Sequence, residues 1–189
     1  HSLHAYFIRR GDHTEPIRFE VDRLRNGRSF ATRSVVARQA VGAILQMSAS
    51  FQRDEPGPIV ERAELPIVDA PEDVPSGQWS AMFDNRKVKY PNEPGHVTAW
   101  FKMTDPIGDD PLLQACALAF VSDDVPTETV VSQHPDHGNP DLPENAWMAA
   151  SLDHAIWFHR APVVDEWLLT DTRCHGLLNS RGLAVGNAF

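Results

Sequence analysis

The chain has 189 residues, of which 42% are hydrophobic and 23% charged, a balance typical of a water-soluble globular protein. Its formal net charge of −9 argues against a general nucleic-acid-binding role, because such proteins usually present a basic surface, although a local arginine cluster can still bind a phosphate-bearing ligand. No apolar run reaches the ~20 residues that a membrane-spanning helix needs. Two cysteines, Cys116 and Cys174, do not form a disulfide framework or a metal-binding motif. We therefore expect a cytoplasmic protein without a metal or another cofactor.

The first part of the chain shows the alternation of apolar and polar residues that is typical of strands. Strands are predicted over residues 2–9, 17–21, 29–38 and 43–52. Asn26-Gly27 is predicted to supply the two positive-φ residues of a type I′ hairpin turn. Together these segments predict a four-stranded antiparallel meander.

Five prolines recur among acidic residues from Glu55 to Gly77, which predicts an ordered linker with little regular structure. Two further strands are predicted over residues 87–90 and 96–103. Residues 127–145 read as a polar loop; it contains His134 and His137, but too few further ligands on rigid elements to predict a metal site.

A helix is predicted between these segments, from Pro111 to Asp123. Asp110 is a favourable N-cap, Pro111 suits the first turn, and Val125-Pro126 is expected to end the helix. The helix is apolar nearly all round, so it is expected to be buried on every side, with Cys116 as a buried thiol. A curved antiparallel sheet is the covering element that this arrangement favours.

Residues 149–160 predict a strand that is covered on both faces. Ser151 lies near its start, on the face opposite a mostly apolar set that comprises Ala150, Leu152, His154, Ile156 and Phe158. Residues 2–10 repeat the pattern of residues 151–160 with one residue dropped, and two further blocks recur in the same order. This order favours a duplicated unit over chance similarity.

Asp123 is the candidate general base, because a carboxylate at the end of a buried apolar helix is poorly solvated and its pKa is expected to rise. Ser151 begins the strand that is expected to return beside the helix, so the two side chains together are predicted to hold a water. The alternatives are a carboxylate that bonds loop amides and a small strand residue without a role. Nucleophilic serine catalysis has less support, because the chain lacks a G-x-S-x-G motif and Asp153 and His154 point to opposite faces.

The stretch Ser151–Arg160, followed by Asp165-Glu166-Trp167-Leu168-Leu169 and Ser180-Arg181-Gly182, resembles the acyl-CoA thioesterase II family, as do residues 1–12 and 48–52. The resemblance implies an α+β double-hotdog fold, in which two antiparallel sheets each wrap a long helix, and hydrolysis of acyl-CoA thioesters. The family's catalytic Asp and hydroxyl residue correspond to Asp123 and Ser151. Its catalytic Gln has no counterpart before Phe189, and Gln52 occupies the corresponding position in the first repeat.

The resemblance also implies the domain organisation: residues 1–56 as a partial N-terminal hotdog, 57–80 as a Pro-rich linker, and 81–189 as a C-terminal hotdog. The first hotdog helix and the last strand or strands of the second hotdog are missing from this pattern, so we expect a partial view of a longer protein. Without that helix the first sheet leaves an apolar surface, and missing residues, a partner chain or local disorder is expected to cover it. The candidate residues for this surface are Phe7, Phe19, Phe30 and Phe51.

The leading hypothesis is therefore hydrolysis of acyl-CoA by an activated water, with the positive end of the helix polarising the thioester carbonyl. Two alternatives stay open: a hotdog hydratase or dehydratase of enoyl- or hydroxyacyl-CoA, and a non-catalytic acyl-binding module. A hydratase commonly uses an acid–base His paired with a helix carboxylate, and no His follows Asp123 in the predicted helix. The expected partners are the acyl-CoA substrate and further copies of the chain in a homo-oligomer.

Overall fold

The computed structural model describes residues 1–77, 80–89, 93–143 and 148–189. The chain divides into two compact units. The first unit comprises His1–Val60 and Ser151–Arg160, and the second comprises Glu61–Ala150 and Ala161–Phe189.

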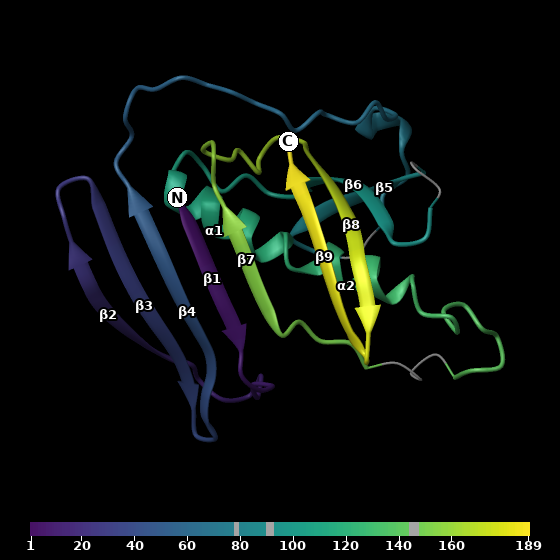
Figure 1. The fold of residues 1–189 in the computed structure, drawn as a ribbon, viewed down its shortest axis with the longest axis horizontal. Coiled ribbons are helices and arrows are strands. Elements are labelled where there is room, and N and C mark those ends of the chain that lie inside the picture. Colours follow the sequence, from purple (N-terminus) through teal and green to yellow (C-terminus); the bar gives the residue numbers. More distant parts are fainter. Residues whose placement is uncertain (78–79, 90–92, 144–147) are drawn as a thin grey trace. The chain divides into compact units, whose positions relative to one another are not determined.

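The first unit is built on one antiparallel sheet of five strands in the order β2-β3-β4-β1-β7 (Figure 1). The strands are β1 (Ser2–Phe7), β2 (Arg18–Asn26), β3 (Phe30–Gln39), β4 (Gly42–Gln52) and β7 (Asp153–Trp157). All four strands predicted in the first part of the chain are present, but the predicted meander is wrong, because β1 pairs with β4 rather than with β2.

The strand predicted around residues 149–160 also lies in this sheet and does not pair with the later strands of the predicted C-terminal hotdog, which corrects the expected topology. β7 runs antiparallel to β1, and His4 lies opposite Ala155 at the middle of the pairing. The two segments that resemble each other in sequence are therefore direct neighbours. The backbone groups along the facing edges of β1 and β7 form hydrogen bonds with each other.

Strand register gives the first sheet one strongly apolar face. The residues on this face include Leu3, Ala5, Phe7, Phe19, Val21, Val35, Leu45, Met47 and Phe51. Phe19 is 63% exposed and Phe51 is 40% exposed, and the described part of this unit contains no helix. Phe30 lies opposite Gln52 on the other, more polar face, so the four predicted phenylalanines do not share one surface. What covers the apolar face stays a prediction.

The hairpin turns differ from the expectation at Asn26-Gly27. Neither residue has a positive φ, and three residues, 27–29, connect β2 to β3. The type I′ geometry occurs instead at Asn179-Ser180, where both residues have positive φ (50° and 60°) between the paired Leu178 and Arg181.

The second unit contains a four-stranded antiparallel sheet in the order β5-β6-β8-β9. Its strands are β5 (Phe83–Val88), β6 (His96–Met103), β8 (Leu168–Leu178) and β9 (Arg181–Ala188). β6 has the predicted bounds, whereas β5 begins and ends earlier than the strand predicted over 87–90, whose last residue lies outside the described residues.

The Pro-rich segment before β5 packs on this sheet. It contains one short 3₁₀ helix, η1 (Pro71–Asp73). The indole Nε1 of Trp100 donates to the carbonyl of Asp69 at 3.0 Å, and the Arg86 guanidinium donates to the carbonyl of Pro71 at 2.5 Å. Arg86 also lies 4.7 Å from the centre of the Trp167 ring, a cation–π distance. These contacts explain how a segment with little regular structure is ordered.

Two helices, α1 (Pro111–Val121) and α2 (Asp124–Val131), follow β6. The predicted cap is confirmed: Asp110 Oδ1 accepts from the amides of Leu112 and Leu113 at 2.9 and 3.4 Å. α1 ends at Val121, two residues before the predicted end at Asp123. Val125-Pro126 is not its stop signal, because both residues lie in the first turn of α2, where proline is tolerated. α2 also occupies the start of the loop predicted over residues 127–145.

The predicted all-round burial of the first helix is wrong. Leu118 and Val121 are buried, but Leu112 and Phe120 are exposed, as is the Cys116 thiol that was expected to be buried. A helix that is apolar on every side carries no sequence signal for the face that meets the sheet. Within the described residues, no helix is long and apolar enough to cross a membrane.

α2 packs against β6, β8 and β9 (Figure 1). Gly182 of β9 lies directly against Val130 of α2, so that a Cβ at this position would overlap the Val130 methyl groups. Glycine at this strand position therefore permits close approach of the helix to the sheet.

Candidate functional site

Asp123 lies at the junction of α1 and α2, in the N-cap position of α2. Its carboxylate makes no capping hydrogen bond to α2, and the residue is partly buried. The backbone of Asp123 is helical (φ −82°, ψ −15°), which keeps its side chain from the usual capping geometry. A partly buried carboxylate without a capping bond at a helix junction is compatible with the predicted role of a base.

The neighbouring carboxylate, Asp124, is a candidate that the sequence did not reveal. Burial raises its pKa above the usual range, and the negative charges of Glu128 and Asp123 raise it further, against the opposite effect of Lys87. A carboxyl group with a raised pKa beside a candidate base is a functional-site feature. Asp124 is therefore a rival to Asp123 for proton transfer.

Ser151 belongs to the first unit and is partly buried. The predicted strand start is two residues early, because β7 begins at Asp153. The segment is nevertheless held in place next to β1, since the amide of Phe7 donates to the carbonyl of Leu152 at 3.0 Å. Asp123 and Ser151 belong to different units, and a water held between them stays a prediction.

Asp153 and His154 face opposite sides of β7, as the alternation predicted: Asp153 lies opposite Tyr6, and His154 lies opposite Ala5. Asp153 instead contacts His4 on the adjacent strand, with 3.2 Å between Oδ2 and Nε2. Both side chains are about half exposed, so this ion pair is a surface feature of the sheet.

The positive end of α1, which was expected to polarise the thioester carbonyl, is the end that Asp110 caps. The Asp110 carboxylate already accepts from the first free amides of the helix. Asp123 lies beyond the other end of α1, and a helix of 11 residues is about 16 Å long. The amides that are close to Asp123 in the chain belong to the first turn of α2.

Two buried polar clusters in the second unit also had no sequence signal. His96 Nε2 and Thr98 Oγ1 lie 2.5 and 2.8 Å from Asp171 Oδ1, and His96 Nδ1 has no hydrogen-bond partner within the described residues. Gln114, buried in α1, accepts from the amide of Val164 at 2.6 Å and donates to Asp165 at 3.0 Å. The Gln114 side chain therefore connects α1 to the loop before β8 and has a structural role. No cluster of three or more metal-ligating side chains occurs among the described residues.

Comparisons with known proteins bear on both units. Residues 61–189 match the acyl-CoA thioesterase C-terminal domain, and residues 1–52 match the acyl-CoA thioesterase N-terminal domain. The whole chain is 31% identical to acyl-CoA thioesterase 2 of Haemophilus influenzae and covers 73% of that protein.

This chain belongs to the acyl-CoA thioesterase II family. By family it is a thioester hydrolase. A solved acyl-CoA thioesterase II from Mycobacterium marinum superposes with a TM-score of 0.86 at 38% identity, over all of this chain and 73% of the other.

The fold comparison extends to a more distant protein with a hot dog fold from Alicyclobacillus acidocaldarius. That chain has a TM-score of 0.78 at 18% identity, over all of this chain and 71% of its own length. The α+β, hotdog-like arrangement of two antiparallel sheets and a long helix is therefore confirmed.

Proposed function

We propose that this protein hydrolyses acyl-CoA thioesters to a free fatty acid and CoA, with a water activated by Asp123 and positioned by Ser151. The observation that carries the proposal is the match of the entire chain to acyl-CoA thioesterases, from Haemophilus influenzae at 31% identity and from Mycobacterium marinum at 38%. The partly buried Asp123 carboxylate, free of a capping bond at the start of α2, supports its assignment as the base.

In the proposed reaction the water oxygen attacks the thioester carbonyl carbon while the Asp123 carboxylate takes one of its protons. The tetrahedral intermediate then collapses, the C–S bond breaks, and the CoA thiolate leaves and receives the proton. Amides of the first turn of α2 lie next to Asp123 in the chain and carry the partial positive charge that suits a developing oxyanion. No covalent acyl-enzyme forms in this scheme.

We also propose that residues 1–56 and 81–189 are hotdog repeats, joined by the linker 57–80, that assemble as a cytoplasmic homo-oligomer. The pairing of β1 with β7, the two segments that resemble each other, supports a duplicated unit. Light scattering after size-exclusion chromatography tests the assembly, and a purely monomeric mass would contradict it.

The test of the reaction is release of free CoA from octanoyl-CoA, detected with a thiol reagent, in wild type and in Asp123→Asn, Asp124→Asn and Ser151→Ala. Loss of a general base typically lowers kcat about 10²- to 10⁴-fold. We expect that loss for Asp123→Asn, and a kcat within about threefold of wild type for the matched neighbour Asp124→Asn.

Each other outcome has a defined meaning. The reverse ranking of the two carboxylates would assign the base to Asp124, whose raised pKa makes it the rival. An active Asp123→Asn and an active Asp124→Asn would refute base catalysis by this junction. Hydration of crotonyl-CoA, or binding of acyl-CoA without turnover, would favour one of the two alternative functions instead.

A further inference from the structure

The more polar face of the first sheet presents a cluster of short hydroxyl side chains. Direct partners in antiparallel strands share a face, so the pairings of β1, β3 and β4 place these side chains next to one another. Ser48 lies in the middle, because β4 is the third of the five strands and Ser48 pairs with His4 on one side and Ser34 on the other. We call this cluster the hydroxyl face; its members are Ser2, Thr32, Ser34, Ser48 and Ser50.

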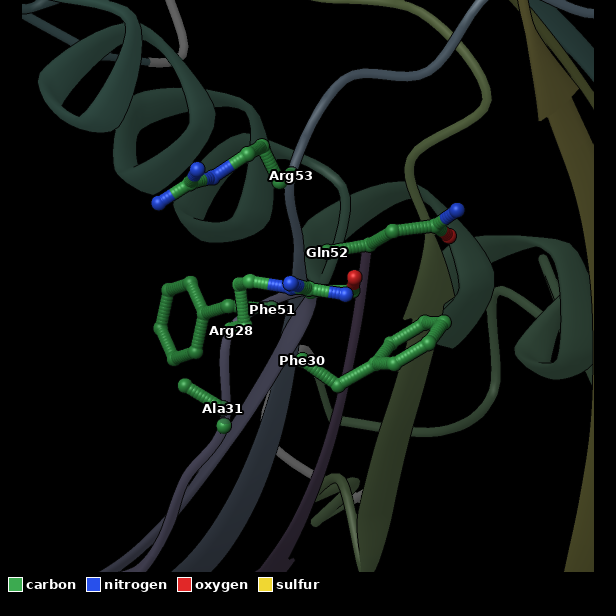
Figure 2. Close-up of a pocket in the computed structure, with 8 residues that line it drawn as sticks. Arg28, Phe30, Ala31, Phe51, Gln52 and Arg53 are labelled. Carbon is green, nitrogen blue, oxygen red and sulfur yellow. The ribbon is translucent and has the colours of Figure 1, made fainter.

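Three large aromatic side chains flank the hydroxyl face. Strand register places Tyr6 and Trp157 on it, where they are 51% and 62% exposed, and Phe30 is 42% exposed. Figure 2 shows its end near the β2–β3 turn, where Phe30 and Gln52 extend to one side of the strands and Phe51 extends to the other. Exposed Trp and Tyr side chains held on strands are typical anchors of a protein interface, because they bury a large area at low entropic cost.

Charged side chains lie at the margins of this face. On the side of β2, Arg18 and Arg38 both pair with Glu20, at 2.6 and 2.7 Å. On the side of β7, the Asp153 carboxylate lies 3.2 Å from His4. Stable protein interfaces have the same arrangement, with few charges and many aromatic residues in the centre and a polar rim. The hydroxyl face therefore has the composition of a contact surface between proteins.

The size of the face suits a second copy of this chain. Five strands spaced ~4.8 Å apart, with about eight residues each at ~3.4 Å per residue, give a face of about 700 Å². Two such faces bury about 1,400 Å² in total, which lies within the range of about 1,200–2,000 Å² for stable interfaces. Sheets that pack face to face lie ~10 Å apart with nearly aligned strands, and the short hydroxyl side chains leave room for that approach.

The two margins carry opposite excess charge. The side of β2 has three arginines and two carboxylates, and the side of β7 has one carboxylate, Asp153. A two-fold axis along β4 brings the β2 side of one copy over the β7 side of the other, so opposite charges meet. An axis across the strands brings each side over its own equivalent, so like charges meet. Charge complementarity therefore favours the axis along β4. The charged residues on the side of β2 are Arg18, Glu20, Asp22, Arg25 and Arg38.

We propose that the hydroxyl face is the contact surface between two copies of this chain, related by a two-fold axis along β4, with Ser48 at its centre and Tyr6 and Trp157 as its anchors. This inference rests on the proposed homo-oligomer and names the surface that forms it. Because such an interface is built from the same patch on both copies, each substitution in it acts twice.

The first test introduces charge at the centre of the interface. Ser48→Arg sets two long, like-charged side chains against each other at the axis, so we expect the Kd of the dimer to rise at least about 100-fold. Light scattering at a series of protein concentrations measures this dissociation. The matched control, Asn187→Arg, adds the same side chain at an exposed strand position of the second unit and is expected to keep the wild-type Kd. An unchanged Kd for Ser48→Arg would overturn the proposal.

A truncation keeps the proposal testable if Ser48→Arg does not fold. Trp157→Ala removes a side chain that is 62% exposed, so it leaves the interior of the unit intact, and it is expected to raise the Kd about 30-fold, as loss of an interface anchor does. Leu183→Ala is the control, because Leu183 is 60% exposed on β9 of the second unit. Equal Kd values for the two variants would contradict an anchoring role of Trp157.

Cross-linking tests the position of the axis. In a Cys116→Ser background, which removes the exposed native thiol, Ser48→Cys places two thiols at the axis of the dimer. A short bis-maleimide is expected to join two chains of this variant and not of the control Asn187→Cys. A dimer that does not cross-link at position 48 would have its interface elsewhere, which overturns the proposal.

These outcomes separate failure of this inference from failure of the proposed function. A wild type that is monomeric at every concentration would overturn this inference together with the proposed homo-oligomer. An oligomer whose mass changes with neither Ser48→Arg nor Trp157→Ala would mean that solvent or another partner covers the hydroxyl face, and would overturn this inference alone. Release of CoA tests thioester hydrolysis independently of both results.

Discussion

Replacing Asp171 by Ala is expected to destabilise the second unit strongly. The Asp171 carboxylate accepts from His96 Nε2 at 2.5 Å and from Thr98 Oγ1 at 2.8 Å. The His96 and Asp171 side chains are only 4% and 14% exposed. Removing this acceptor of β8 leaves two buried donors of β6 without a partner, at the centre of the sheet.

The expected cost follows from these contacts. A hydrogen bond to a charged group contributes about 1.5–3 kcal/mol, so two such bonds give about 3–6 kcal/mol. Asp171 is slightly exposed, so in the variant water can replace part of the lost hydrogen bonding. We therefore expect a destabilisation in the lower half of this range, about 3–4 kcal/mol. Thr98→Val removes one of the two donors at nearly constant volume and is expected to cost about 1.5–2 kcal/mol.

The chain contains its own control for this experiment. Asp153 pairs with His4 through the same two types of side chain, but that pair is 3.2 Å long and about half exposed. Asp153→Ala is therefore expected to cost less than about 1 kcal/mol.

Urea unfolding followed by tryptophan fluorescence measures both variants, because Trp100 and Trp167 report on the second unit and Trp157 on the first. If the units unfold separately, Asp171→Ala should shift only the transition of the second unit. Equal destabilisation by Asp171→Ala and Asp153→Ala would refute the reasoning from burial.

Two further changes test the packing and the electrostatics of the second unit. Gly182→Ala is expected to cost about 1–3 kcal/mol, because the added methyl overlaps the stiff, β-branched Val130, and Val130→Ala in the Gly182→Ala background should recover part of that loss in a urea-based double-mutant cycle. Additive effects would contradict the contact. Asp124→Asn tests the raised pKa of Asp124. The Asp124 carboxyl binds its proton more tightly in the folded than in the unfolded state. Its contribution to the stability of the wild type therefore falls as the pH rises above the unfolded-state pKa of about 4. The variant should therefore be more stable than wild type at pH 7 and equal to it near pH 3, and a constant difference across this range would argue against the shift.

The start of α1 and the bounds of β6 were predicted correctly because both depend on residues that are close together in the chain. Asp110 and Pro111 carry the start signals of a helix in adjacent positions, and the structure shows the predicted cap. β6 has the predicted bounds because turn-forming residues flank a short segment that is rich in apolar and β-forming residues. In both cases the determining interactions lie within a few residues of the chain, where a sequence pattern reflects them directly.

The failures concern interactions between distant segments. β7 was assigned to the wrong sheet, because nothing within residues 149–160 specifies that its edge pairs with β1, about 150 residues earlier. Asn26-Gly27 has the composition of a type I′ turn, yet the Phe30–Gln52 pairing sets where β3 begins and leaves a three-residue connection there. At this turn the register of the paired strands, and not the turn propensity of Asn26-Gly27, determines the backbone conformation.

The same distinction separates what was and was not predictable at the candidate site. The sequence made Asp123 a candidate because it follows a helix whose sequence is apolar and because the surrounding residues resemble a family. The raised pKa of Asp124 was not, because it depends on burial and on Glu128, which only the fold of α2 brings to the same face one turn later. Asp123 is a candidate general base because of the family resemblance, and Asp124 is a candidate because of its raised pKa. Because neighbouring residues at the start of a helix point in different directions, only one of them can lie in line with a bound thioester. The variant with the lower kcat, Asp123→Asn or Asp124→Asn, therefore identifies which of the two side chains points toward the bound thioester, and not only which one binds a proton more tightly.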